Sequence, residues 1–542
     1  MFFSSRQQAT ATLFYALLFA GAAIAQTTER VSVDSSGAQA NSYSYNPSIS
    51  SNGNFVAFDS MASNLVGADG NSVTDVFVHD SNSGITERVS LNSSGAQANG
   101  HSYDPSISAN GRYVAFHSGA TDLVSADSNP WKDVFVHDRL TGITTRISVD
   151  SAGGQGNGDS VNAAISADGR FVAFESVANN LVAADANGAW DIFVHDLTTG
   201  TTERVSIGTS GEANGNCLSL TISADGRHVA FSTDANNLVA GDLNGRGDIF
   251  LRDRTTATTE LISVDSFAAQ GDNHSAYPSI SADGNAVAFD SWASNLVSGD
   301  TNGGSDIFVR DRLTGSTERV SMSSMGVEAD SGSEAPSISA DGMHVSFLSY
   351  ASNLIPGDTN SYADVFVHDR ATSITQRVSV SSLGAQSNGF AYFSAISADG
   401  SQVAFYSNAQ SLVPGDTNLT YDIFVHQRWN GMGKNSIYLD GPLFSPVGAP
   451  LQLDWYSAPA SSNFWLVYSL NQNGLLAFGH QFDVGAPYTM LATGVNSAAG
   501  SSSFISAPVP AAAAGLTINF EVAASGGGGV LYDSNVWPVI IL

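Results

Sequence analysis

The chain has 542 residues with a formal net charge of −30 at pH 7, and 42% of its residues are hydrophobic. This length allows two or three domains or one long repeat array, and the negative charge excludes a nucleic-acid or anionic-membrane partner held by electrostatics. Cys217 is the only cysteine, so no disulfide can form within the chain and stability must come from packing.

The first 25 residues have the pattern of an export signal. Arg6 precedes the apolar run 13–21, and Ala23 and Ala25 form a small-x-small cleavage site before Gln26. The apolar run is too short to cross a bilayer, and no second candidate follows it. We therefore expect residues 1–25 to be removed, no transmembrane segment, and a protein that is secreted, periplasmic or attached to the cell surface.

A seven-fold repeat fills residues 26–432. The segment Phe55–Phe58, with sequence Phe-Val-Ala-Phe, recurs at 113–116, 171–174, 228–231, 286–289, 344–347 and 402–405, so the period is 58 residues with one unit of 57. Each unit has four runs with the alternation and the Val, Ile and Phe content of short strands. An Asn-Gly or Asp-Gly pair before the second run supplies the positive φ of a tight hairpin. Four short strands repeated seven times predict an all-β, seven-bladed β-propeller.

The order of the repeats also predicts how the ring closes. Strands of the Thr-Glu-Arg-Val-Ser type begin near residues 28, 86, 144, 202, 259, 317 and 375. The first of them precedes all the units, while the last unit, which ends at His426, has none of its own. We therefore expect residues 28–33 to complete the seventh blade, which removes the open sheet edge of a linear array.

The repeat resembles a known family. Its pattern Pro-Ser-Ile-Ser-x-Asp-Gly-x-x-Val-Ala-Phe, then Asp-Ile-Phe-Val-x-Asp, then Arg-Val-Ser, is similar to the WD40-like (PD40) repeats of TolB-type propellers. The resemblance implies the propeller fold and leaves function open, because such propellers dock proteins, gate enzymes or catalyse reactions. TolB proteins differ in having one blade fewer, a separate N-terminal domain and no Asp-x-Asn insertion in the basic repeat.

Each unit carries an Asp-x-Asn-x-x-x-Asp run before its third strand. The run resembles the calcium loops of FG-GAP propellers, although it is shorter and lacks their middle acid, and calcium takes about six to eight oxygen ligands. The alternative is that these side chains accept backbone N–H groups in Asx-turns. Both interpretations make the runs structural clips, with no cofactor required and calcium as one alternative. The candidate ligands are Asp69, Asn71, Asp75, Asp127, Asn129, Asp133, Asp185, Asn187, Asp191, Asp242, Asn244, Asp248, Asp300, Asn302, Asp306, Asp358, Asn360, Asp364, Asp416, Asn418 and Asp422.

The loops that lead into the first strand of each blade begin alike and then diverge into aromatic and acidic residues. In a propeller these loops crowd one face near the mouth of the central channel. A binding surface requires such an irregular rim and a scaffold does not, while neutral drift in exposed loops is the alternative. The candidate ligand-binding residues are Tyr43, Tyr45, His101, Tyr103, Asp104, His274, Tyr277 and Tyr392.

One repeat position holds five histidines. Equivalent positions spread around a ring and do not converge on one metal, so we interpret them as packing residues at strand ends. The sequence has no nucleophile elbow, zinc-type motif or phosphate loop, and no catalytic residue is assigned. The five residues are His79, His137, His195, His368 and His426, with Arg252 and Arg310 at the same position of the other two units.

A different kind of sequence follows the repeats. Residues 429–435 read as a linker, and residues 436–542 contain no Lys or Arg. Strand-like runs at 451–456, 464–470, 516–522 and 536–542 alternate with Gly, Pro, Ser and Ala turns. They predict a small antiparallel β-sandwich with an accessory role.

Two functional hypotheses remain. The first is an exported, monomeric, non-enzymatic propeller that binds a protein or carbohydrate partner through its loop face. The alternative is a polysaccharide lyase or hydrolase with its site at the channel mouth, because some lyases use PD40-type propellers with a histidine-bound metal. His101 and His274 would then act with Asp104, Tyr103 and Tyr277, although the two histidines lie three blades apart.

Overall fold

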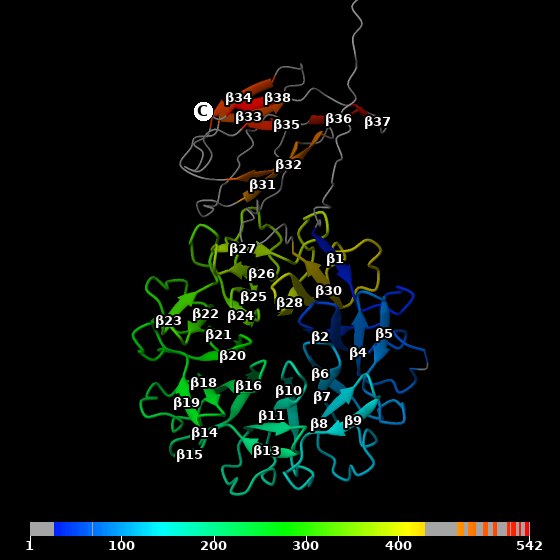
Figure 1. Ribbon diagram of the computed structural model, residues 1–542, viewed down its shortest axis with the longest axis vertical. Coiled ribbons are helices and arrows are strands. Elements are labelled where there is room, and N and C mark those ends of the chain that lie inside the picture. The colour runs from blue at the N-terminus through cyan, green and yellow to red at the C-terminus, as the bar shows by residue number, and fades with distance from the viewer. Residues whose placement is uncertain are drawn as a thin grey trace, which may run out of the picture.

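The computed structural model describes residues 26–428 except Ala68, together with the backbone of eight strands in the C-terminal region. Residues 26–428 form seven four-stranded antiparallel sheets arranged in a ring (Figure 1). The all-β, seven-bladed propeller predicted from the repeat is therefore confirmed. The predicted signal segment and linker lie outside the described residues. The part of the chain that the structure describes contains no helix long and apolar enough to cross a membrane.

The strands of each blade follow one another from the centre of the ring to its edge. Blade 1 comprises β2 (Ser44–Ile49), β3 (Phe55–Ser60), β4 (Asp75–Asp80) and β5 (Ile85–Arg88). Blades 2 and 3 comprise β6 (Ser102–Ile107), β7 (Tyr113–Ser118), β8 (Asp133–Asp138), β9 (Ile143–Arg146), β10 (Ser160–Ile165), β11 (Phe171–Ser176), β12 (Asp191–Asp196) and β13 (Thr201–Arg204). Blade 4 comprises β16 (Cys217–Ile222), β17 (His228–Thr233), β18 (Asp248–Asp253) and β19 (Thr258–Leu261), preceded by the short hairpin β14 (Ile207–Gly208) and β15 (Gly211–Glu212).

The remaining blades repeat this arrangement. Blades 5 and 6 comprise β20 (Ser275–Ile280), β21 (Ala286–Ser291), β22 (Asp306–Asp311), β23 (Ser316–Arg319), β24 (Ser333–Ile338), β25 (His344–Ser349), β26 (Asp364–Asp369) and β27 (Ile374–Arg377). Blade 7 comprises β28 (Ala391–Ile396), β29 (Gln402–Ser407), β30 (Asp422–Gln427) and the N-terminal strand β1 (Thr27–Arg30).

Strand β1 closes the ring as predicted. It pairs antiparallel with β30, with Thr28 opposite His426 and Arg30 opposite Phe424. The regular strand ends at Arg30, and the next residue, Val31, still donates its N–H to Ile423. The seventh sheet is thus built from the two ends of the repeat region, so opening the ring requires breaking this pairing.

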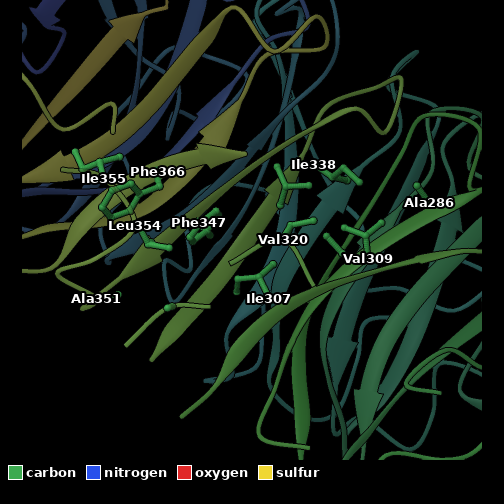
Figure 2. Close-up of a cluster of buried hydrophobic side chains, with 13 residues drawn as sticks. Ala286, Ile307, Val309, Val320, Ile338, Phe347, Ala351, Leu354, Ile355 and Phe366 are labelled. Carbon is green, nitrogen blue, oxygen red and sulfur yellow. The ribbon is translucent and has the colours of Figure 1, made fainter. Parts of the chain in front are cut away.

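The core lies between adjacent blades and consists of aliphatic and aromatic residues, most of them from the two middle strands, with further residues from the first strand and the loops. Figure 2 shows one such layer, in which Ile307 and Val309 of blade 5 lie with Ile338 and Phe347 of blade 6, all of them buried. In each blade a phenylalanine of the second strand stacks on one of the third, as Phe347 does on Phe366 with ring centroids 6.0 Å apart. Burying each such ring contributes about 1.5–3 kcal/mol, and seven similar layers stabilise the ring.

The innermost strand of every blade carries a β-bulge. The pairing register between first and second strands shifts in all seven sheets. At each bulge one non-glycine residue has a positive φ, which is 47° at Tyr277 and 32° at Phe393. The seven residues are Asn46, Asp104, Asn162, Ser219, Tyr277, Ala335 and Phe393.

The bulges correct one sequence-based expectation. The divergent residues were expected on loops, but Tyr45, Tyr103, Asp104, Tyr277 and Tyr392 lie within the inner strands. A bulge interrupts strict two-residue alternation and adds a left-handed residue, so these segments lack the usual sequence pattern of a strand.

The C-terminal strands form antiparallel pairs. Strands β31 (Asn463–Leu470), β32 (Leu475–Asp483), β36 (Val522–Gly526) and β37 (Val530–Tyr532) make one sheet. Strand β33 (Leu491–Asn496) pairs with β34 (Ser502–Ser506), and β35 (Thr517–Phe520) pairs with β38 (Trp537–Ile540). Three of the four predicted strand-like runs therefore contain strands, whereas run 451–456 lies outside the described residues. The β-sandwich stays a prediction.

The pairing of β1 with β30 predicts that the two ends of the repeat region depend on each other. Deleting residues 26–33 should abolish the cooperative thermal transition followed by circular dichroism, because it exposes the β30 edge and breaks the ring. A synthetic peptide of residues 26–36 should restore the transition, and deleting only residues 1–25 should leave it unchanged. An unaltered melt without β1 would contradict ring closure by this strand.

Candidate binding site at the inner rim

The seven Asp-x-Asn-x-x-x-Asp runs end in a fully buried aspartate at the start of each third strand. In blade 1, Asp75 accepts a hydrogen bond from the Ser90 hydroxyl at 2.5 Å and from the Asn71 amide at 2.9 Å. Arg88, which follows 13 residues later on the outer strand, lies 3.0 Å from both Asp75 and Asp69. The buried carboxylate therefore joins the third strand, the fourth strand and the preceding loop.

The asparagine of each run makes the Asx-turn that was one of the two sequence-based interpretations. The Asn71 carboxamide oxygen accepts the N–H of Val73, and its NH₂ group donates to the carbonyl of Ala98 in the loop that leads to the next blade. The equivalent turn forms in all seven blades, at Asn71, Asn129, Asn187, Asn244, Asn302, Asn360 and Asn418.

Six of the seven runs hold an arginine guanidinium between their two aspartates. Its Nη1 atom lies 3.0–3.5 Å from each carboxylate, and the arginine side chains are 5–10% exposed. The guanidinium supplies the positive charge that a calcium ion would otherwise provide. The six arginines are Arg30, Arg88, Arg146, Arg204, Arg319 and Arg377.

Blade 4 is the exception. Leu261 occupies the register position of Arg88, since it pairs with Phe250 as Arg88 pairs with Phe77. The Gln270 amide instead donates to Asp242 at 2.8 Å and to Asp248 at 2.9 Å. Burial raises the pKa of Asp248. The calcium hypothesis stays a prediction, and run 242–248 is the copy in which no outer-strand arginine lies between the two aspartates, although the exposed Arg246 lies within the run.

The histidines of the outer repeat position pack as expected. The His79 Nδ1 atom lies 2.8 Å from the Thr86 hydroxyl, and that hydroxyl donates to the carbonyl of Val33. The same histidine–threonine contact recurs at His137, His195, His368 and His426. Arg252 and Arg310 contact the equivalent threonines, so this position ties the outer strand to the loop that covers it.

The two histidines of the lyase alternative hold backbone groups of separate blades. The Nδ1 atom of His101 accepts the N–H of Thr74, and that of His274 accepts the N–H of Gly247, both at 2.9 Å. In the intervening blades, Asp159 and Asn216 accept the equivalent N–H groups. His101 and His274 thus join adjacent blades at two separate places in the ring.

Aromatic residues gather on the innermost strands of blades 5, 7 and 1 and on the second strand of blade 7. We call this set, Tyr45, Tyr277, Tyr392, Phe393 and Tyr406, the aromatic sector of the inner rim. The Tyr45 and Tyr392 rings both contact Tyr406, with centroids 5.1 and 5.6 Å away. Phe393 stacks on Tyr406 at 6.1 Å and also meets Tyr277 at 6.4 Å, past the small Ala335 bulge residue of blade 6.

A polar sector continues the rim over blades 1 and 2. The Asn46 amide donates to Asp59 at 3.0 Å and to Asp104 at 2.6 Å, so two carboxyl groups share one amide nitrogen. Burial, and then the charge of Asp104, raise the pKa of Asp59 to about 8. His117 is buried, its Nδ1 atom lies 3.6 Å from Asp104, and burial lowers its pKa to about 3.

Three buried acids of the second strands clip adjacent blades together. Asp59 accepts the backbone N–H of the next bulge residue, Asp104, at 3.2 Å. Glu175 accepts that of Ser219 at 2.7 Å, and Asp290 accepts that of Ala335 at 3.1 Å. Burial raises the pKa of Glu175 and of Asp290 to about 7. These acids are therefore protonated at mildly acidic pH.

Seven of the eight predicted rim residues belong to these contacts. The Tyr43 ring is tilted against that of Tyr45, with centroids 5.1 Å apart. His101 stacks on Tyr103 at 5.6 Å, and Tyr103 in turn contacts His117. Among the eight, His274 stands apart, because its ring accepts the backbone N–H of Gly247 and contacts none of the other rim residues among the described contacts.

The sequence interpretation overlooked Asp59, His117, Glu175, Asp290 and Tyr406. All five occupy the position directly after Val-Ala-Phe, where the other blades have Ser232 and Leu348. Variation within an otherwise repeated strand was the signal that could have identified them.

No protein-family model and no curated protein matches this sequence. Among solved structures, the chain is similar to TolB from Agrobacterium tumefaciens, with 17% identity, a TM-score of 0.33, and coverage of 54% of this chain and 83% of that one. For TolB from Acinetobacter baumannii the identity is 15%, the TM-score 0.34, and the coverage 68% and 76%. The acylaminoacyl peptidase of Pyrococcus horikoshii has 10% identity and a TM-score of 0.41. The match covers 68% of this chain and 49% of that chain, about half of the enzyme. These likenesses concern the propeller fold alone.

The buried aspartate network predicts unequal effects of two opposite substitutions. Arg88→Leu should cost about 3–5 kcal/mol of unfolding free energy, because it leaves two buried carboxylates without their cation. Leu261→Arg should stabilise blade 4 at pH 7 by supplying that cation to Asp242 and Asp248. Chemical denaturation measures both, and a cost below about 1 kcal/mol for Arg88→Leu would contradict the network.

The same network predicts which loops can take up calcium. We expect the six arginine-filled runs to bind no calcium, so any ion bound by the acidic runs should occupy 242–248 and be lost in Asp242→Asn. Calorimetric titration with calcium after EDTA treatment measures the number of ions. Seven ions in these runs would show that the guanidinium groups are displaced.

Proposed function

We propose that this protein is an exported, non-enzymatic glycan-binding propeller whose aromatic sector contacts sugar rings. The observation that carries the proposal is the state of Tyr277 and Phe393. Both residues have left-handed backbone conformations, and their side chains are 48% and 43% exposed.

Neither backbone preference nor burial accounts for these two rings. A bulky residue with positive φ costs about 1–3 kcal/mol, whereas glycine there costs little. Burial offsets this cost only in part, because nearly half of each ring remains in water. An exposed aromatic ring held in a strained conformation is a feature of binding sites, so a ligand that covers both rings is the simplest reason for their presence.

The chemistry of the rim favours a glycan. Sugar rings offer apolar C–H faces that lie against aromatic faces and hydroxyl groups that need polar partners. The aromatic sector supplies the first, and the adjacent polar sector supplies carboxyl and amide groups at Asp104 and Asn46, with the Asp104 side chain 39% exposed. The net charge of −30 disfavours strongly anionic ligands and leaves neutral oligosaccharides as the preferred class.

The proposal is one of binding without covalent chemistry. The Nδ1 atoms of His101 and His274 accept backbone N–H groups in separate blades, so these two nitrogens are not free to act as a base or a metal ligand. Burial lowers the pKa of His117, so this ring is neutral at pH 7 and contributes no positive charge to an anionic substrate. No arrangement among the described residues favours the lyase or hydrolase alternative over binding.

The proposal predicts that binding and stability separate at Tyr277. Tyr277→Gly should weaken oligosaccharide binding at least tenfold, because one stacking surface is lost, while relief of the left-handed backbone leaves stability equal or up to about 1 kcal/mol higher. Calorimetry with a panel of soluble neutral and acidic oligosaccharides, and thermal melting, measure the two effects. Phe393→Gly should behave in the same way.

Ala335→Gly is the matched control, since it changes the same bulge position of blade 6 without removing a ring. It should leave binding intact. If no oligosaccharide binds at millimolar concentration, or if Tyr277→Gly binds as tightly as the unaltered protein, the glycan proposal is wrong. If a protein partner binds instead, and its binding depends on Tyr277 and Phe393, the rim is a protein-binding site and not a glycan-binding site.

A further inference from the structure

We infer that ligand binding at the inner rim is linked to a proton shared by Asp59 and Asp104, so that the site binds at acidic to neutral pH and releases its ligand at alkaline pH. The inference rests on the proposed binding function, but the carboxyl pair on which it depends can be tested without a ligand.

The geometry of the pair carries the inference. One amide nitrogen, Nδ2 of Asn46, donates to Oδ1 of Asp59 and to Oδ1 of Asp104, which places the two carboxyl groups on either side of a single donor. The backbone N–H of Asp104 also donates to Asp59. Asp59 is 2% exposed, so its charge would be poorly solvated. Because Asp59 is buried and lies next to the partly exposed Asp104, the two carboxyl groups do not both ionise easily, and the pair retains one proton.

The titratable groups around Asp59 and Asp104 do not supply enough positive charge to ionise both carboxyl groups. Tyr45 and Tyr406 face Asp59, and both are neutral below pH 9 because burial raises their pKa. Asp104 faces the positive charge of Lys132, the neutral ring of His117 and the acid Glu175. Burial raises the pKa of Asp104, and the charge of Lys132 and the Asn46 amide oppose this rise. Burial and the charge of Asp104 raise the pKa of Asp59 to about 8, so the shared proton resides mainly on Asp59.

The repeat provides internal comparisons. Glu175 and Asp290 occupy the same strand position as Asp59 and make the same bond to the next bulge N–H. Their bulge partners, Ser219 and Ala335, carry no acid, although the charge of Glu334 acts on Asp290 and that of Asp104 acts on Glu175. Among the described blades, the junction of blades 1 and 2 therefore places a second carboxyl group at the bulge opposite the first. This difference separates a proton-sharing pair from an ordinary inter-blade clip.

Ionisation of the pair acts on the rim directly. Asp59 is the cross-strand partner of Tyr45, whose ring contacts Tyr406 and Tyr421. Asp104 is itself a bulge residue of the rim, with φ of 50°. Ionisation of Asp59 would place a second negative charge beside Asp104, and the repulsion between the two carboxylates would displace the partly exposed Asp104 carboxyl group that faces the ligand.

The first experiment tests the pair in the full chain without a ligand. Asp59 has a higher pKa folded than unfolded, so the unfolded state releases its proton first and folding stability falls as pH rises from about 4 to about 8, then levels off. Asp59→Asn should remove this part of the pH dependence. A double-mutant cycle of Asp59→Asn with Asp104→Asn should be non-additive and vary with pH, whereas a cycle with the distant Asp290→Asn should be additive.

The second experiment measures oligosaccharide dissociation constants between pH 5 and pH 9.5 for the tightest-binding member of the panel. For the unaltered protein we expect the constant to rise by about tenfold per pH unit above pH 8, as one required proton is lost. Asp59→Asn, which keeps the size and neutrality of the protonated acid, should bind with a constant that stays level across this range. Its affinity should match that of the unaltered protein at pH 5.

The outcomes are distinct. An additive Asp59–Asp104 cycle, a pH-independent constant in the unaltered protein, or the same alkaline loss in Asp59→Asn would each overturn the inference while the glycan proposal stands. Failure of every oligosaccharide to bind at any pH would overturn the proposed function and the linkage with it. In that case a pH-dependent, non-additive cycle would still establish the carboxyl pair.

Discussion

The propeller depends on one buried carboxylate per blade. Asp75 and its six equivalents, all fully buried at the start of the third strand, accept hydrogen bonds from a serine at the end of the fourth strand. In six blades an arginine balances the charge, and an Asx-turn asparagine extends the contact to the loop that enters the next blade. A buried charge is tolerated only when paired and hydrogen-bonded, so this network ties loop, strand and neighbouring blade into one unit.

Because the network lies toward the outside of each blade, the inner strands are free to differ. Their bulges place seven side chains of six kinds around the axis, from Asn46 and Asp104 to Tyr277 and Phe393. The aromatic side chains contact one another across blades, while the acids of the second strands hold the bulge backbones in place. The repeated part of each blade therefore provides rigidity, and the varied part provides a surface with a distinct chemistry in each sector.

Local sequence patterns predicted the fold well because the same strand and turn motifs recur at a fixed spacing along the chain. The blade number follows from the 58-residue spacing and the turn glycines in the sequence. The closing strand follows from the extra strand that precedes the first unit, and this strand pairs with β30. The arginine partners were missed because Arg88 and Asp75 are 13 residues apart and meet only through strand pairing. Most rim candidates were identified by their variability, but Asp59 and Tyr406 were missed because their neighbours on the second strand are core residues. Bulges depend on backbone geometry, which two-residue alternation does not reveal.

Hydrogen–deuterium exchange with and without the tightest-binding oligosaccharide of the panel tests the central claim most directly, namely that the inner strands form the binding site. We expect slower exchange confined to peptides that contain β20, β28 and β2, since these strands carry Tyr277, Phe393 and Tyr45. The Asx-turn runs should show no change. Protection confined to the outer strands or to residues 436–542, with the inner strands unaffected, would contradict the account.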